Sequence, residues 1–211
     1  SLVDISSYKF EGKGGYPKPD HVHLADCPDP FRGRFRGRVD DTSLGTKYAD
    51  QVKSCMQAAA DADTPIGAFF AESLPGCGGQ IVPPAGYLSQ AFQHVRDAGG
   101  VCISDEVQVG LARSGPPFWG LQAVDADAVP DIITTGKPTG NGFPVAAVIT
   151  TRAIATAFNN GMEYFNTFGG NPVSCAIGKE VLAVIKREGL QKNALEVGSY
   201  LKSELQNMQT E

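Results

Sequence analysis

The sequence lacks long hydrophobic runs and has no excess of basic residues. No apolar stretch approaches the roughly 18 residues that a membrane-spanning helix needs, and the first residues lack the basic and hydrophobic regions of a signal peptide. The 211 residues carry 18 Lys and Arg against 23 Asp and Glu, a net charge of −5, without a long basic run. This balance argues against a nucleic-acid surface. The expected partners are small molecules or other protein chains, with no nucleic acid and no membrane.

The cysteines do not form the pattern of a disulfide framework. The cysteines are odd in number and widely spaced, and no Cys-x-x-Cys pair occurs. A reducing cytosol fits this pattern best, so we expect a cytoplasmic protein in which most of these residues are small apolar fillers. The five are Cys27, Cys55, Cys77, Cys102 and Cys175.

Hydrophobic residues make up 42% of the chain, enough for one sizeable core, and their spacing predicts alternating helices and strands. This alternation predicts an α/β fold with a mostly parallel, doubly wound sheet. On the helix at 172–187 the inner face is expected to hold Val173, Ile177, Val181, Val184 and Ile185. Buried strands are expected at 66–71, 101–104, 132–135 and 145–150, and helices at 46–61, 85–98, 118–124, 152–158, 172–187 and 191–208.

Three ionisable side chains follow predicted strands directly. Glu72 and Asp105 each end a strand, and Lys137 comes just after another. Because the carboxyl ends of parallel strands line the ligand crevice of an open α/β sheet, Asp105 and Lys137 would face one cavity. A lysine and an acid suit pyridoxal phosphate, which needs an amine for a Schiff base and an acidic partner for its ring nitrogen. On these two residues alone, an aspartate that caps the next helix and a solvated lysine would be the preferred interpretation.

Longer motifs change that preference. DEVQVG at 105–110, GKPTGNG at 136–142 and NTFGGNP at 166–172 resemble, in order and spacing, the class III aminotransferases of the fold-type I pyridoxal phosphate enzymes. The resemblance covers nearly the whole chain. Within the family the ethanolamine-phosphate phospho-lyase branch is most similar, on the words AES (71–73), CGGQ (77–80), PPAGY (83–87) and GMEYF (161–165).

The resemblance implies a role for each site residue. Lys137 would bind the cofactor and later act as general base, and a desolvated site is expected to keep its amine neutral. Asp105 would pair with the ring nitrogen, Val107 would pack on the ring, and Gln108 would hydrogen-bond the phenolic oxygen. Glu72 would shape the substrate side. No metal is expected.

The family also implies an assembly. Residues 1–189 would be part of the large cofactor-binding domain, and 190–211 a helix leading to a small C-terminal domain that the sequence does not contain. Thr167 resembles the threonine that reaches the cofactor phosphate of a neighbouring subunit, which implies a homodimer with shared active sites. A Gly-rich turn capped by Asn171 is the alternative for this segment. The chain is thus expected to be a fragment that cannot hold the cofactor fully.

Three hypotheses about function remain. The first is a lyase that eliminates phosphate from phosphoethanolamine or a related phosphorylated amine. The second is a transaminase that moves an amino group from an amino acid such as alanine to glyoxylate or pyruvate. The third is a non-catalytic fragment or dimerisation module. One departure from the family, Leu111-Ala112-Arg113 where relatives usually have Phe-Gly-Arg, bears on substrate fit.

Two other polar clusters have weaker interpretations. His21 and His23 would share one face of a strand, but no third ligand stands at matching spacing, so an ordinary strand is expected. The segment 31–38 contains four arginines and could grip a phosphate group. A solvated basic loop balanced by Asp40 and Asp41 is at least as good an explanation.

Overall fold

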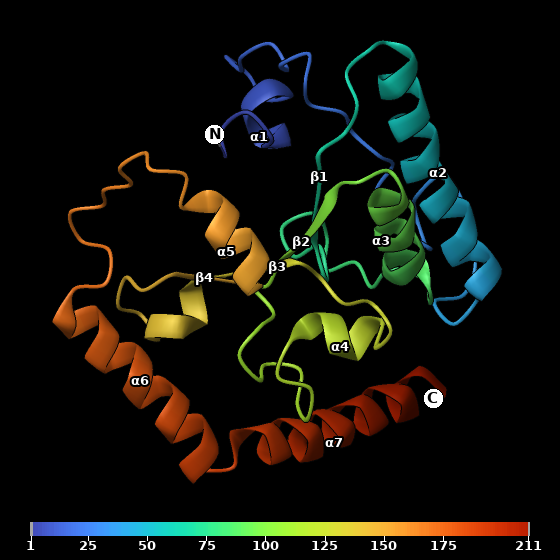
Figure 1. Cartoon of the computed structure of the whole chain (residues 1–211). Helices are drawn as coiled ribbons and strands as arrows, with labels where there is room; N and C mark the ends of the chain where they lie inside the picture. Colours follow the sequence, from blue (N-terminus) through green and yellow to red (C-terminus); the bar gives the residue numbers. More distant parts are fainter. Residues whose placement is uncertain (1, 211) are drawn as a thin grey trace.

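A computed structural model describes residues 2–210 and shows one mixed sheet with helices packed around it (Figure 1). The strands are β1 (Ala68–Glu72), β2 (Val101–Asp105), β3 (Ile132–Thr135) and β4 (Ala147–Thr150), in the spatial order β1-β2-β3-β4. The first three are parallel, and β4 runs antiparallel to β3. The predicted mostly parallel α/β sheet is confirmed. All four strands lie within two residues of their predicted starts or ends, at 66–71, 101–104, 132–135 and 145–150.

The prediction that the fourth strand is buried is wrong. Ala147, Val148 and Ile149 are exposed, because no described helix packs closely over either face of β4. Apolar β-branched residues indicate a strand, but they do not show whether a neighbouring element covers it.

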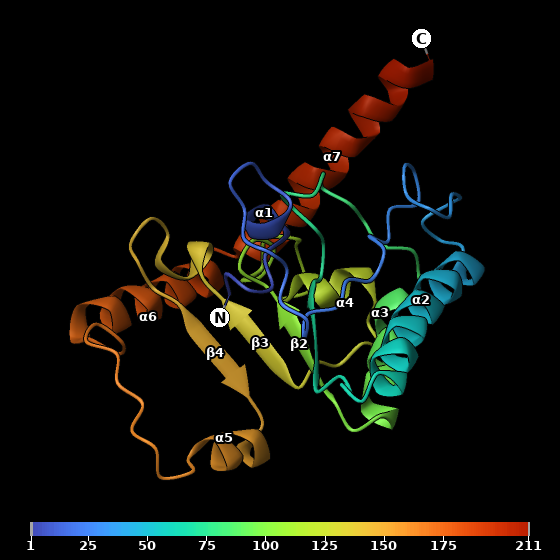
Figure 2. The same cartoon turned by 90° about the horizontal axis from the view of Figure 1, so that it is seen from above.

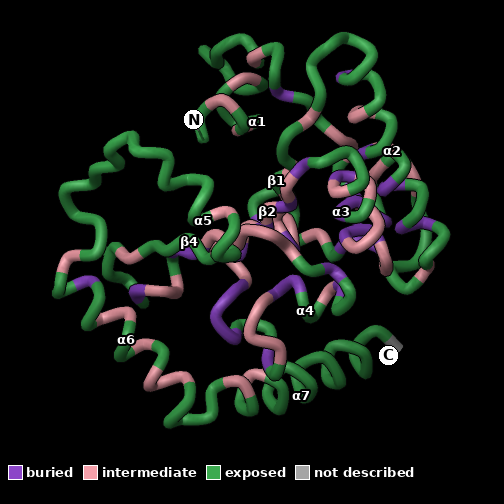
Figure 3. The backbone as a smooth tube through the Cα atoms, viewed as in Figure 1, coloured by how far each residue is buried: buried purple, intermediate pink, exposed green. Residues whose placement is uncertain are grey.

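The core lies between the sheet and two helices, α2 (Thr42–Asp61) and α3 (Tyr87–Asp97). Figure 3 shows buried residues concentrated around this helix pair and the strands beside it. The helix predicted at 46–61 begins earlier, because the Asp41 carboxylate accepts a hydrogen bond from the Ser43 N–H at 2.9 Å and caps it. The fully buried side chains include Tyr48, Leu88, Phe92, Val95 and Cys102.

The remaining helices are α1 (Ser7–Phe10), α4 (Gly120–Val124), the 3-10 turn η1 (Lys137–Gly140), α5 (Arg152–Phe158), α6 (Pro172–Arg187) and α7 (Leu190–Thr210). Viewed from above, α7 projects away from the sheet (Figure 2). Within residues 2–210, no helix is both long enough and apolar enough to cross a membrane.

Helix α6 packs against η1, which places it beside the segment that follows β3. Asn171 caps it by accepting the Ser174 N–H at 3.0 Å, as the alternative for this segment predicted. Of the residues expected on its inner face, Ile177, Val181, Val184 and Ile185 are half-buried. Val173 is exposed, so its assignment was wrong. It lies in the first turn of the helix, where the neighbouring Ser174 is the residue that is buried.

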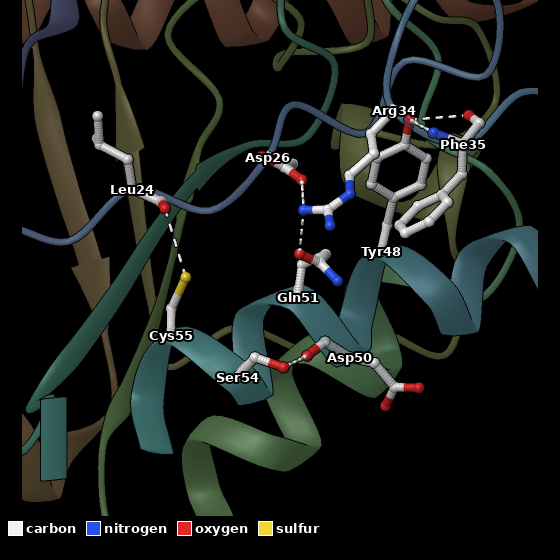
Figure 4. A network of polar contacts seen from close by, with 9 residues as sticks. All are labelled: Leu24, Asp26, Arg34, Phe35, Tyr48, Asp50, Gln51, Ser54 and Cys55. Atoms are coloured by element: carbon white, nitrogen blue, oxygen red, sulfur yellow. Dashed lines mark hydrogen bonds and ion pairs between the residues drawn. The ribbon is translucent and has the colours of Figure 1, made fainter. Parts of the chain in front are cut away.

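The arginine-rich segment serves to pack the chain onto α2 (Figure 4). The Tyr48 hydroxyl donates to the backbone carbonyl of Phe35 in this segment at 2.8 Å, and to that of Asp29 just before it at 3.0 Å. Arg34 pairs with Asp26 at 3.1 Å. Arg38 pairs with Asp40 at 2.8 Å, which supports the balanced-loop interpretation over a phosphate grip.

The histidine prediction was wrong in its local structure. His21 and His23 lie outside any strand, in a connecting segment of irregular backbone. Across the described part of the chain, no group of three His, Cys, Asp or Glu residues could hold a metal ion.

Candidate functional site

The ends of β1, β2 and β3 are aligned in the sheet. In the register of the sheet, Glu72 is opposite Asp105, and Asp105 is opposite Thr134. Paired residues on neighbouring strands point to the same face, so these three side chains share one face at the carboxyl end of the sheet. Lys137 begins η1 immediately beyond the end of β3.

Gln108 links the lysine to the aspartate strand. The Lys137 Nζ donates a hydrogen bond to Gln108 Oε1 at 2.8 Å. The Asp105 Oδ1 accepts the Val107 N–H at 2.8 Å, so the carboxylate stabilises the turn that carries Val107 and Gln108. Residues that follow two different strands, β2 and β3, therefore converge on one small region.

A close contact completes this region. A β-carbon on Gly136 would lie 3.2 Å from Val107 Cγ1, which shows that Val107 packs directly over the backbone before Lys137. Thr134 Oγ1 is buried without a hydrogen-bond partner in the described structure. It lies in the same register row as Asp105.

Lys137 is exposed in this structure, and its desolvation in a site that holds the cofactor stays a prediction. The alternative that Asp105 caps the next helix is wrong. Its neighbour Glu106 does so, accepting the Gly120 and Leu121 N–H groups of α4 at 2.8 Å each.

Glu72 and the loop after it lie on the other side of Gln108. Glu72 Oε2 accepts the Gly76 N–H at 2.9 Å, so its partner here is backbone. A β-carbon on Gly76 would lie 2.1 Å from Gln108 Nε2, and Cys77 Sγ lies 4.0 Å from Gln108 Oε1. The word CGGQ at 77–80 indicates the family but does not by itself predict this contact. The glycines of this loop are the sequence feature that could have predicted a close approach of its backbone to another residue.

Thr167 lies in the exposed segment between α5 and α6. Among the described residues, no hydrogen bond or ion pair joins it to Lys137, Asp105 or Glu72. Its assignment to a cofactor phosphate stays a prediction, as do the roles of the other site residues.

The groups that meet here suit pyridoxal phosphate. The cofactor needs an amine, an acid for its ring nitrogen, a hydrogen-bonding group for its phenolic oxygen and an apolar side chain against its ring. Lys137, Asp105, Gln108 and Val107 provide these four kinds of group, and the glycine at 136 lets Val107 approach the lysine backbone. The residues present fit the cofactor.

Comparison with known proteins decides the family. A family model described as aminotransferase class-III matches residues 11–211. The chain belongs to the class III aminotransferases. The family predicted from the sequence is therefore confirmed, and with it the fold class.

Two relatives show how this class III aminotransferase chain relates to curated proteins. A Drosophila melanogaster protein named alanine–glyoxylate aminotransferase 2-like is 48% identical over 213 residues, covering 100% of this chain and 43% of the relative. A Caenorhabditis elegans protein named ethanolamine-phosphate phospho-lyase homolog 1 is 42% identical over 218 residues, covering 99% and 46%. The chain thus spans less than half the length of these relatives.

A solved structure has a similar fold. A phospholyase from Arthrobacter in complex with phosphoethanolamine superposes with a TM-score of 0.81 at 35% identity, covering 91% of this chain and 44% of the other.

Proposed function

We propose that this chain supplies the lysine side of a pyridoxal phosphate site in an enzyme that acts on a primary amine. The observation that carries the proposal is the hydrogen bond from Lys137 Nζ to Gln108, on the turn that Asp105 stabilises. When bound, the cofactor supplies an electron sink for a bond breaking next to the substrate nitrogen.

Each residue of the chain has a task in this scheme. Lys137 holds the cofactor through Nζ, and the same nitrogen accepts a proton from the substrate carbon once it is released. Asp105 keeps a proton on the ring nitrogen through its carboxylate. Gln108 has an amide N–H that it would donate to the phenolic oxygen, and Val107 would pack against the ring.

For the reaction we propose elimination of phosphate from a phosphorylated primary amine such as phosphoethanolamine. The support is the naming of the C. elegans relative and of the Arthrobacter structure. Transamination from alanine to glyoxylate is the second candidate, because the Drosophila relative carries that name at 48% identity. Lys137 can move the proton in either reaction, so the site residues named above do not separate the two.

The test uses the protein that contains this chain. Phosphoethanolamine is expected to release inorganic phosphate and ammonia, and the mixture of alanine and glyoxylate to give no pyruvate. Pyruvate without phosphate release would favour the transaminase. Purified protein should show a visible cofactor absorption band that disappears in Lys137→Ala. A protein that never shows such a band would support the third hypothesis, a non-catalytic module.

We also propose that two copies assemble with Thr167 directed at the cofactor phosphate of the other copy. The exposure of Thr167 between the exposed Phe165 and Phe168 supports this assembly. In a dimer, Thr167→Ala should weaken cofactor binding and leave the dimer intact. A cytoplasmic location, which the five free cysteines support, and a domain boundary near residue 190, where α7 begins, complete the proposal.

A further inference from the structure

Glu106 is a fully buried carboxylate next to the cofactor site, and the scheme above gives it no task. Its exposed fraction is 0%. It follows Asp105 directly at the end of β2, so the two side chains leave the backbone on opposite sides. Asp105 belongs to the site face, and Glu106 points into the protein beneath it.

Both oxygens of Glu106 are engaged by the start of α4. Oε2 accepts the Gly120 N–H and Oε1 accepts the Leu121 N–H, each at 2.8 Å, and the Ser104 hydroxyl donates to Oε1 at 3.4 Å. These are two of the backbone donors that a helix start leaves without an intrahelical partner. The carboxylate therefore joins α4 to the end of β2.

The backbone of Glu106 makes two further connections. Its N–H donates to the Thr134 carbonyl at 2.9 Å, and its carbonyl accepts the Gly110 N–H at 3.0 Å, closing the turn over 106–110. One residue thus ties together β3, this turn and α4.

Two glycines beside this residue allow close approaches of the backbone. A β-carbon on Gly120 would lie 2.6 Å from Val109 Cγ2, and one on Gly110 would lie 2.7 Å from the Glu106 carbonyl oxygen. The start of α4 therefore lies directly against the turn that carries Val107 and Gln108. A shift of α4 towards this turn would press Gly120 against Val109.

Burial of the carboxylate has an energetic cost. Desolvation raises the pKa of Glu106, and the hydrogen bonds from Leu121 and Gly120 oppose that shift. None of the ion pairs found among the described residues includes Glu106. An isolated buried carboxylate is destabilising unless hydrogen bonds compensate it. An apolar side chain at this position could not accept the two N–H groups of α4, so it could not join α4 to the turn.

We propose that Glu106 is a positioning residue that holds the turn 106–110 against α4, so that Gln108 stays within hydrogen-bond reach of Lys137 and Val107 keeps its place over Gly136. The inference rests on the proposed pyridoxal phosphate site. It assigns Glu106 no contact with the cofactor.

The decisive variant is Glu106→Gln in the holoenzyme. Glutamine has the same shape, but its amide nitrogen would face one of the two N–H groups that the carboxylate now accepts. Asp125→Asn is the matched control, because Asp125 is also buried and accepts the Ser89 N–H at 2.9 Å, at the other end of α4.

Both variants should lower the thermal midpoint. Only Glu106→Gln should raise the dissociation constant of pyridoxal phosphate, by on the order of tenfold or more, because small misplacements of site groups have effects of this size. It should also move the pH midpoint of the visible cofactor band, and Asp125→Asn should leave both readouts at the wild-type values. Glu106→Gln with wild-type affinity and midpoint, or equal changes in both variants, would overturn the proposal.

If Glu106→Gln fails to fold, Ser104→Ala decides by the same criteria. It removes one donor to the carboxylate and should give a smaller shift in the same direction. A wild-type protein without a Lys137-dependent band would overturn the proposed function itself. A normal wild-type band with unchanged Ser104 and Glu106 variants would overturn only the role of Glu106.

Discussion

Ala112 occupies a backbone conformation that glycine adopts without strain. Its φ is +64°, and that of Leu111 is +56°. The family pattern that the sequence resembles usually has glycine at the second of these positions, so the alanine there has a physical cost. A non-glycine residue in this left-handed region is destabilised by about 1–2 kcal/mol.

We expect Ala112→Gly to leave stability almost unchanged. Relief of the left-handed strain offsets the roughly 0.5–1 kcal/mol of backbone entropy and the ~0.8 kcal/mol of a buried methyl group. Ala91→Gly is the control, because Ala91 is also buried but lies inside helix α3. It should lose at least about 1 kcal/mol in urea unfolding. Equal losses in the two variants would show that residue 112 is not strained.

Cysteine reactivity gives a second prediction for single residues. Burial raises the pKa of Cys102 to about 12, and its thiol lies in the core. Cys77 and Cys175 are exposed. Iodoacetamide at neutral pH should therefore modify Cys77 and Cys175 in the folded protein and spare Cys102 until urea unfolds it, as peptide mass spectrometry would show. Labelling of Cys102 at a rate similar to Cys175 would contradict the core placement.

Helix α2 depends on a cap that titrates. The side chain and backbone N–H of Ser43 lower the pKa of Asp41, whose carboxylate caps this helix. Because the folded pKa is below the unfolded one, the stabilisation is present above the ordinary aspartate pKa of about 4 and is lost as the pH falls through the folded pKa.

Asp41→Asn should remove that pH step, since asparagine caps as well but does not titrate. Thermal unfolding from neutral to acidic pH should show the wild-type advantage over this variant shrinking towards low pH. Asp41→Ala should be less stable at every pH. A constant difference between wild type and Asp41→Asn would mean that the ionised cap does not stabilise α2.

The sequence predicted where the helices and strands lie better than it predicted which of their residues are buried. Periodicity located the strands and the long helices, because an apolar face leaves a local pattern. The start of α2 was missed, since its first turn is polar and the cap at Asp41 is a contact of one side chain. The burial of β4 and of Val173 depends on which element lies beside them, and that is decided by residues far away in the chain.

The site shows the same division. Lys137, Asp105, Val107 and Gln108 could be named from family words, and the structure brings them together. Glu106 could not be assigned in this way, because its role depends on where α4 begins relative to β2. The closeness of Gly76 to Gln108 likewise depends on the path of a loop.

Across the whole molecule, apolar side chains are distributed unevenly. The core lies around α2 and α3, whereas large apolar residues are exposed on β4, on the segment 158–173 and along α7. On α7, Leu201 and Leu205 are each 57% exposed and Met208 is 70% exposed. Contiguous exposed apolar surface of this kind marks a place where another surface packs.

We therefore expect the 211-residue chain, purified by itself, to self-associate at micromolar concentration. Replacing Leu201, Leu205 and Met208 by glutamine should shift sedimentation velocity profiles towards the monomer, because it removes apolar area without removing core contacts. Lys202→Gln with Glu204→Gln, on the same exposed helix, is the matched control and should leave association unchanged. A wild-type chain that sediments as a monomer, or a control pair that dissociates it equally, would show that the apolar side chains of α7 do not drive association.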